Sequence, residues 1–212
     1  MFTGIVQGMA EVVAVEEKPL FRTHTLRFPP EWLDGLETGA SVAHNGCCLT
    51  VTAIDGERVS FDLIKETLRV TNLNDVTVGS LVNIERAAKF SDEIGGHLMS
   101  GHIMTTAEIV KIISSENNKE VWFKLQDASL SKYVLHKGFI GIDGCSLTLG
   151  DVVGNKFCVH LIPETLQRTL LGVKKIGSRV NIEIDPNTQA IVDTVERVLA
   201  ARELTDNVLP LS

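Results

Sequence analysis

The chain has 212 residues, a formal net charge of −7 and 44% hydrophobic residues. This length suits one large domain or two small ones of about 100 residues, and an acidic chain without a basic stripe is not expected to bind nucleic acid. No apolar run approaches the roughly 18 residues of a membrane-spanning helix, and the N-terminus lacks the basic start of a secretory signal. The four cysteines form no C-x-x-C pair and are too few for a secreted disulfide framework. We therefore expect a cytoplasmic protein with no nucleic-acid or membrane partner.

One local motif occurs twice. NGCCLTV at 45–51 matches DGCSLTL at 143–149 after a shift of 98 residues. The same shift places DLIKETL on HLIPETL and GSLVNIE on GSRVNIE, and a shift of 97 places TGIVQGMAEV, from Thr3, on SGHIMTTAEI, from Ser100. These matches indicate one duplicated module.

Each module has the pattern of a small β-barrel. Residues 41–64 form three apolar strands broken at Asn45-Gly46 and at an Asp-Gly pair, dipeptides that accept the positive φ angles of type I′ hairpin turns. Residues 138–162 repeat this scheme with Asp143-Gly144 and a Gly-Asn pair. Because short strands spaced by turns favour a sheet closed on itself, we predict an all-β fold of two similar Greek-key β-barrels from an internal duplication.

The segments outside these strands complete each module. LVNIERA and RVNIEID each supply a further strand, and KETLRVTNL and PETLQRTLLG predict short helical connections, the second with Pro163 at its first position.

A C-terminal amphipathic helix is predicted from Asp185-Pro186 onward, because Ile191, Val195, Val198 and Leu199 fall at i, i+4, i+7 and i+8. This apolar face either folds back on its own barrel or pairs with the same helix of another subunit. The last residues, 205–212, are expected to be frayed. The predicted domains are an N-terminal barrel at 1–96, a C-terminal barrel at 97–186, and the helix with its tail at 187–212.

Several motifs resemble those of the riboflavin synthase family, the trimeric type with duplicated barrels: MFTGIV, NGCCLTV, SDEIGGHLMSGHI, GIDGCSLT and IPETL. The resemblance extends from Met1 to about residue 205. It implies the last step of riboflavin biosynthesis: two molecules of 6,7-dimethyl-8-ribityllumazine give riboflavin and 5-amino-6-ribitylamino-pyrimidinedione by transfer of a four-carbon unit, with no metal, nucleotide or redox cofactor. It also implies a homotrimer whose site joins the N-terminal barrel of one subunit to the C-terminal barrel of its neighbour. Association with lumazine synthase is left open.

The resemblance also implies two pockets that bind the lumazine. For the first barrel the implied residues are Gly4, Ile5, Val6, Cys48, Leu49, Thr50, Asp62, Leu63, Ile64, Lys65, Glu66 and Thr67. For the second they are Gly101, His102, Ile103, Lys137, Ser146, Leu147, Thr148, Ile162, Pro163, Glu164, Thr165, Leu166 and Gln167. Thr50 and Thr148 would offer hydroxyls to the pteridine edge, and Glu66 and Glu164 would accept hydrogen bonds from the ribityl chain.

Four residues are candidates for catalysis: Cys48, His102, Ser146 and Thr148. A thiolate is a good nucleophile once its pKa is lowered, so the change from Cys48 to Ser146 fits a donor and an acceptor that need different chemistry; the alternative is neutral drift, with Cys48 as a small buried hydrophobe. His102 is a suitable proton carrier, with a packed barrel histidine as the alternative. A metal site with His97 is disfavoured, because no third ligand stands at a recognisable spacing.

The remaining candidates have structural alternatives. Phe2 packs against a substrate ring or plugs the barrel, and Asp185 serves the site or, slightly favoured, caps the helix. Ser41 and Asp143 are further candidates near the motifs. We expect packing roles for Cys47 and Cys145, and surface or packing roles for His24, His44, His136 and His160.

Two other functions are possible for such a fold. A non-catalytic lumazine- or flavin-binding antenna protein shares this type of fold, but such relatives tend to lose the ligand residues of one barrel, whereas both copies here keep Leu-Thr and Glu-Thr-Leu. A flavin reductase would leave the repeat unexplained, and no glycine-rich dinucleotide fingerprint follows a strand. The sequence favours the synthase.

Overall fold

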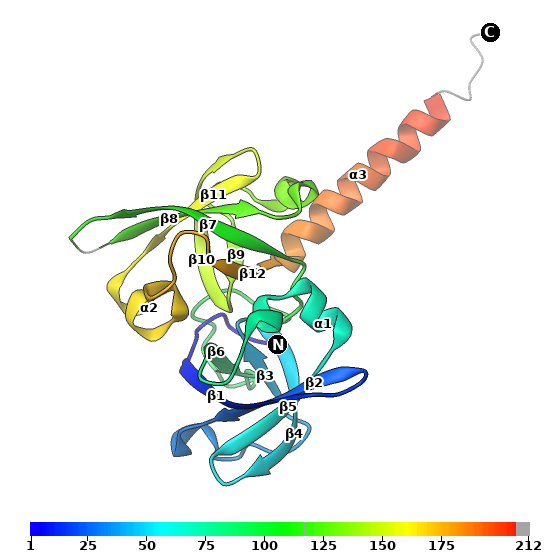
Figure 1. Ribbon diagram of the computed structural model, residues 1–212. Coiled ribbons are helices and arrows are strands. Elements are labelled where there is room, and N and C mark those ends of the chain that lie inside the picture. Colours follow the sequence, from blue (N-terminus) through cyan, green and yellow to red (C-terminus); the bar gives the residue numbers. More distant parts are fainter. Residues whose placement is uncertain (117, 207–212) are drawn as a thin grey trace.

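A computed structural model describes residues 1–116 and 118–206, and in these residues the chain forms two closed antiparallel barrels of six strands each, followed by a projecting helix (Figure 1). The all-β duplicated fold is therefore confirmed. The first barrel contains β1 (Gly8–Glu17), β2 (Phe21–Arg27), β3 (Ser41–His44), β4 (Cys47–Asp55), β5 (Arg58–Ile64) and β6 (Leu81–Arg86). The second contains β7 (Thr105–Ser114), β8 (Lys119–Leu125), β9 (Phe139–Ile142), β10 (Cys145–Val153), β11 (Lys156–Leu161) and β12 (Arg179–Ile184).

The two barrels have one topology. The strand order β1-β2-β5-β4-β3-β6 recurs as β7-β8-β11-β10-β9-β12 around the second barrel. Even the irregularities repeat: β1 has a register shift after Val12 and β7 after Ile109, its counterpart at a shift of 97. A bulge bends its strand and increases the twist, so these shifts help to close both barrels in the same way.

Each barrel has its own apolar core, built by alternation along the strands. In β5, for example, Val59, Phe61 and Leu63 are fully buried, whereas the residues between them are partly exposed. Because successive side chains of a strand point to opposite faces, this pattern fills the barrel interior. The connecting helices α1 (Lys65–Val70) and α2 (Pro163–Arg168), and short 3-10 turns such as Asn72–Asp75 and Leu170–Gly172, lie where the sequence predicts helical connections.

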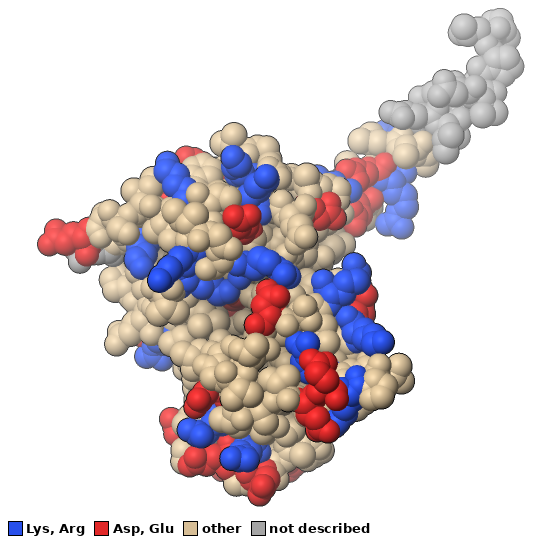
Figure 2. Space-filling view, in the orientation of Figure 1, with Lys and Arg blue, Asp and Glu red and all other residues tan. Residues whose placement is uncertain are grey.

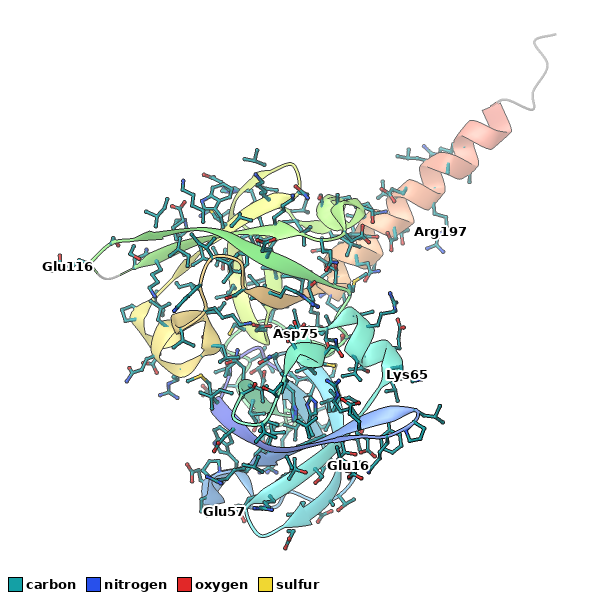
Figure 3. The ribbon with its side chains drawn as sticks, in the orientation of Figure 1. Glu16, Glu57, Lys65, Asp75, Glu116 and Arg197 are labelled. Carbon is teal, nitrogen blue, oxygen red and sulfur yellow. The ribbon has the colours of Figure 1, made fainter. Side chains whose placement is uncertain are left out.

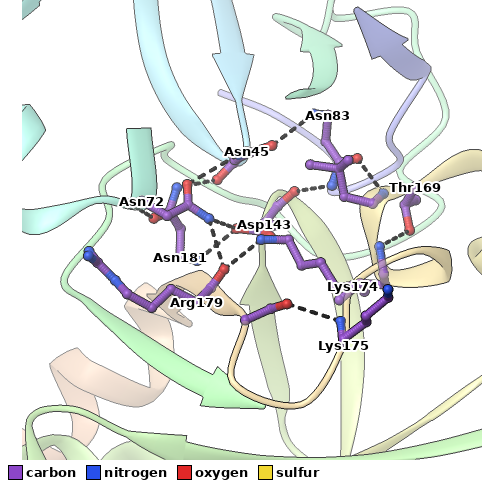
Figure 4. Close-up of polar contacts among 12 residues, drawn as sticks. Asn45, Asn72, Asn83, Asp143, Thr169, Lys174, Lys175, Arg179 and Asn181 are labelled. Atoms are coloured by element: carbon purple, nitrogen blue, oxygen red, sulfur yellow. Dashed lines mark hydrogen bonds and ion pairs between the residues drawn. The ribbon is translucent and has the colours of Figure 1, made fainter. Parts of the chain in front are cut away.

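A polar network joins the two barrels (Figure 4). The hairpin turns at Asn45-Gly46 and Asp143-Gly144 have positive φ angles and abut, so that a Cβ on Gly46 would lie 2.7 Å from the Gly144 nitrogen. Across the junction, the Asn83 amide donates to the Asp143 carbonyl, and the Asn181 amide donates to the Asn45 carbonyl, each at 2.9 Å. Because these groups are buried and mutually satisfied, the network fixes how the barrels dock.

The helix α3 (Pro186–Asp206) leaves the second barrel and projects away from both (Figure 1). Asp185 caps it: its carboxylate accepts from the Thr188 N–H at 3.0 Å and from the Asn187 N–H at 3.4 Å. Of the two roles expected for Asp185, the structure shows the helix cap. The helix ends at Asp206, and residues 207–212, most of the tail expected to be frayed, lie outside the described part of the chain.

One face of α3 contacts the chain's own barrel and another is exposed. Val192 packs against the second core, and Tyr133 donates to Asp193 at 2.5 Å. Ile191, Val195, Val198 and Leu199 are each about half exposed or more, so their face does not fold back on the barrel in this chain. No helix within residues 1–116 and 118–206 is long and apolar enough to cross a bilayer.

Charge is mixed over the surface. On the face shown in Figure 2, Lys and Arg are interspersed with Asp and Glu, apart from one band of Lys and Arg across its middle. Asp75, which lies at the junction of the barrels in Figure 3, pairs with Arg179 at 3.2 Å.

Candidate ligand-binding pockets

The two candidate sites, one on each barrel, are assembled by an exchange of segments between the barrels. The segment before β1 crosses to the second barrel, where the Gly4 carbonyl accepts from the Ser146 N–H at 2.8 Å and Val6 joins the second core. The segment before β7 crosses to the first barrel, where the Gly101 carbonyl accepts from the Cys48 N–H at 2.9 Å. Each barrel therefore lends its leading segment to the other.

Glycine is required at both crossing points. Gly4 and Gly101 have φ angles of +75° and +81°, and a Cβ there would lie 2.4 Å from the Ser146 Cβ and 2.5 Å from the Cys48 Cβ, respectively. Any side chain would collide as well as strain the backbone. The repeated Gly of the two leading segments thus sets how closely each segment approaches the strand that carries the candidate Cys or Ser.

A buried carboxylate anchors each crossing segment. Glu85 accepts from the N–H and hydroxyl of Thr3 and from the Gly4 N–H, at 2.6, 2.8 and 3.1 Å. Its counterpart Glu183 accepts from the same groups of Ser100 and Gly101, at 2.6, 2.8 and 3.0 Å. Burial raises the pKa of both carboxyl groups, although the hydrogen bonds oppose this. Both glutamates lie in the repeated VNIE motif, yet sequence reasoning did not assign them.

The second barrel holds a pocket in two parts that share lining residues. One part, of about 380 Å³, is lined by Lys137, Ser146, Leu147, Thr148, Leu149, Gly150, His160, Ile162 and Thr165. The other, of about 220 Å³, shares Ser146, Leu147, Ile162 and Thr165 and adds Gly4, Ile5, Val6, Cys145, Glu164, Arg168 and Thr169. Hydroxyls, a lysine and a carboxylate on an apolar wall are the mixture that binds a small polar heterocycle.

The first barrel carries the counterparts of these pocket residues. Cys48, half-buried on β4, lies against Gly101, and Ile103 packs on the first core. Thr50 is exposed beside Ser41 in the β3–β4 ladder, and Ile64 and Glu66 are exposed at the start of α1. His102 is exposed on the crossing segment, and its N–H donates to the Ser100 hydroxyl at 3.1 Å.

The structure corrects the expected grouping of residues. Gly4, Ile5 and Val6 lie with Ser146 and the second barrel, and Gly101, His102 and Ile103 lie with the first barrel. The sequence shift pairs the two segments but carries no information on which barrel each one enters, so the assignment by domain was wrong for both. Leu63 and Leu166 face the two cores, and Asp62 accepts from the Thr23 hydroxyl at 2.6 Å.

Other candidates lie in structural positions. Phe2 is 1% exposed and pairs with Met99 across the two crossing segments, which is the packing alternative. Asp143, fully buried, belongs to the inter-barrel network. Lys65, Pro163 and Gln167 are exposed on α1 and α2.

The cysteines differ in reactivity. Burial raises the pKa of Cys47 and of Cys145 to about 12, so both remain thiols at neutral pH and pack as expected. Burial also raises the pKa of Cys158. Cys48 differs in being only half-buried.

One histidine at the second pocket was missed. His97 Nδ1 lies 2.6 Å from the Ser146 hydroxyl oxygen. From the sequence, His97 was a candidate only for a metal ligand. Nothing in the repeat pairs it with Ser146, so the contact is seen only in the folded chain.

Known proteins share both the sequence and the fold. The family model of the lumazine binding domain matches residues 3–87 and again 100–185. Riboflavin synthase of Escherichia coli (strain K12) is 74% identical over 203 residues, covering 96% of this chain and 95% of that protein. Riboflavin synthase of Buchnera aphidicola subsp. Schizaphis graminum (strain Sg) is 53% identical over 199 residues, covering 94% and 96%.

Solved structures match the whole double barrel. The crystal structure of LumP complexed with riboflavin has a TM-score of 0.80 at 31% identity, covering 87% of this chain and all of that one. LumP complexed with 6,7-dimethyl-8-(1′-D-ribityl) lumazine has a TM-score of 0.79 at 29% identity, covering 87% and 99%. The duplicated barrels and the repeated family model thus define a double lumazine-binding-domain protein. Within that class, the chain belongs to the riboflavin synthase family.

Proposed function

We propose that this chain converts two molecules of 6,7-dimethyl-8-ribityllumazine into riboflavin and 5-amino-6-ribitylamino-pyrimidinedione by four-carbon transfer. The observation that carries the proposal is 74% identity to E. coli riboflavin synthase over nearly the full length. The two equivalent sets of site residues, one on each barrel, support it, because a reaction between two identical molecules needs two similar binding sites. We place the reaction in the cytoplasm.

The chemical task of the pockets is mainly to hold two rings in register. Such positioning can supply about 7 to 11 kcal/mol of a bimolecular barrier. We then assign nucleophilic assistance to the Cys48 thiol and proton transfer to His102 at the first site, and assistance to the hydroxyls of Ser146 and Thr148 at the second. The other implied pocket residues hold the ligand, with both glutamates at the helix starts, Glu66 and Glu164, facing the ribityl chain.

The assembly we propose is a homotrimer, in which the first barrel of one subunit faces the second barrel of its neighbour. The unpartnered face of α3 supports this, because four apolar side chains project there from a helix that stands clear of the barrels (Figure 1).

Incubation with the lumazine alone, without metal or nucleotide, tests the function. We expect two lumazines to disappear for each riboflavin formed, followed by absorbance and fluorescence. Binding without turnover would instead identify a lumazine- or flavin-binding protein, as LumP is in its crystal structures.

Cys48→Ser should lower turnover at least about tenfold, because a hydroxyl is a far weaker nucleophile than a thiolate at neutral pH. Cys158→Ala, which removes a buried thiol of the second barrel, is the control and should leave turnover within about twofold. Full turnover in Cys48→Ser would remove the thiol from the mechanism.

Val195→Glu should break the trimer, because three added charges would meet at the helix interface. Gel filtration with light scattering measures the mass, and turnover should fall with it. Ala200→Glu places the same charge on the opposite side of α3 and should leave the trimer intact. A fully active Val195→Glu monomer would refute a site shared between subunits.

A further inference from the structure

His97 lies behind the second pocket and contacts it through Ser146. Its Nδ1 is 2.6 Å from the Ser146 Oγ, and Ser146 lines both parts of the pocket. The ring stacks on Phe139, with centroids 5.1 Å apart and planes 17° apart, and the residue is 7% exposed. The imidazole is therefore held in one orientation, with one nitrogen on the hydroxyl that faces the ligand.

The charge state of this ring follows from its surroundings. Burial lowers the pKa of His97, and the carboxylate of Asp185 acts in the opposite direction. The ring is thus neutral at pH 7, and a neutral imidazole has one nitrogen that accepts a hydrogen bond. Nε2 is buried and has no partner among the described residues, so Ser146 is the polar partner of the ring. Buried polar atoms without partners are rare, which indicates a position kept for more than stability.

The first barrel offers different chemistry at the equivalent place. Cys48, the counterpart of Ser146, packs against the cluster of Phe2, Ala43 and Met99 and against Gly101. The first barrel therefore presents a thiol beside apolar groups, whereas the pocket of the second barrel presents a hydroxyl in contact with an imidazole. The change from Cys48 in the first copy to Ser146 in the second therefore alters the hydrogen-bonding group that each site offers to a ligand.

We propose that His97 is a positioning residue of the second pocket: its Nδ1 accepts the Ser146 hydroxyl proton in a hydrogen bond, so that the Ser146 oxygen is presented to the ligand as an acceptor. The partner on the ligand is an N–H or an acidic C–H of a lumazine-type ring. The inference rests on the proposed function for its ligand. Protonated His97 would instead donate to Ser146 and turn that hydroxyl into a donor, so acid should weaken the effect.

Four variants of the full chain test this role: His97→Asn, His97→Phe, Ser146→Ala and the double variant His97→Phe with Ser146→Ala. His97→Phe should lower kcat about tenfold or more with KM changed less than threefold, and it should cost nothing further in the Ser146→Ala background. Asn keeps a polar atom near the Nδ1 position but does not titrate, so His97→Asn should recover part of kcat while losing the acid limb of the pH profile. His136→Asn, at an exposed histidine, is the matched control.

A readout without turnover separates this inference from the proposed function. In the ligand-free protein, the ¹⁵N shift of His97 Nδ1 should report an accepted hydrogen bond, and Ser146→Ala should abolish that signature. Additive losses of kcat in the double variant, an unchanged acid limb in His97→Asn, or an Nδ1 shift insensitive to Ser146→Ala would each overturn the role of His97. Absence of turnover in the wild-type chain, with the NMR signature intact, would overturn the proposed function alone.

Discussion

Acidification below pH 6.5 should unfold the first barrel before the second. The first barrel contains His24 and His44, both fully buried, and none of their four ring nitrogens has a hydrogen-bond partner in the described residues. At shifts of 97 and 98 the second barrel has Val121 and Ile142 in these places, also buried. The first core therefore must take up two buried positive charges when its imidazoles are protonated, whereas the second barrel has one buried histidine with a lowered pKa, His97.

The sign of the effect follows from the pKa values. Burial, with Arg22 nearby, lowers the pKa of His24 to about 4, partly offset by Glu17; burial, with His24 nearby, lowers that of His44 to about 3. In the unfolded chain both titrate near 6.5. Stability is thus greatest above pH 6.5 and is lost as the pH falls from 6.5 towards 4 and then 3, because the unfolded state binds more protons. At pH 5 each histidine costs about 2 kcal/mol, a large share of an ordinary domain's stability.

Other titrating groups do not reverse the order. The raised carboxyl pKa values of Glu85 and Glu183 oppose acid unfolding, but each crossing segment has one such carboxylate. Their contributions to the two barrels are therefore similar, whereas the buried histidine pair belongs to the first barrel alone.

The chain's two tryptophans make the order measurable. Trp32 packs on Phe28 at the first core, with ring centroids 5.7 Å apart, and Trp122 lies on β8 of the second barrel. Single-tryptophan variants, Trp122→Phe and Trp32→Phe, report each barrel in urea unfolding at pH 7.5 and pH 5. His24→Val with His44→Ile copies the second barrel and should remove most of the difference at pH 5. Coincident transitions at pH 5 would contradict the prediction.

The fold could be predicted from the sequence because the signals that specify it are local and occur in both repeats. The Asn45-Gly46 and Asp143-Gly144 turns, the alternating strands and Pro163 at the start of α2 each depend on neighbouring residues. The duplication then made every weak local signal count twice. The Asp185 cap was visible for the same reason, since its partners are two and three residues away.

The candidate sites could be predicted from the sequence only in part, because they depend on contacts between residues that are distant in the sequence. Gly4 meets Ser146 across 142 residues of sequence, and no local property of either residue specifies that partner. The contact of His97 was not predicted for the same reason. Its neighbours Phe139 and Ser146 lie on β9 and β10, more than 40 residues further along the chain. A repeat identifies equivalent residues, but the exchange of segments between the copies is a tertiary property.

Lys174→Met should destabilise the docked barrels by about 3 to 5 kcal/mol, because it leaves a buried carboxylate unpaired. Asp143 is fully buried, and its Oδ2 lies 3.1 Å from the Lys174 Nζ. The other carboxylate oxygen accepts from the Asn72 amide at 2.9 Å and from the Asn181 N–H at 2.7 Å, at the centre of the network in Figure 4. Removal of the lysine therefore places an uncompensated charge between the barrels, and thermal or urea unfolding should show it.

The first barrel supplies the control for this change. At a shift of 98, Asn45 and Val76 stand where the second barrel has Asp143 and Lys174, so one half of the junction already works without the ion pair. Asp143→Asn keeps an oxygen for Asn72 and Asn181 and removes the charge. The double variant Asp143→Asn with Lys174→Met should therefore be markedly more stable than Lys174→Met alone, since replacing both partners of a buried pair costs less than removing one. If the single and double variants lost equal amounts of unfolding free energy, the lysine would stabilise the junction through the packing of its aliphatic side chain. The charge of Asp143 would then need no partner there.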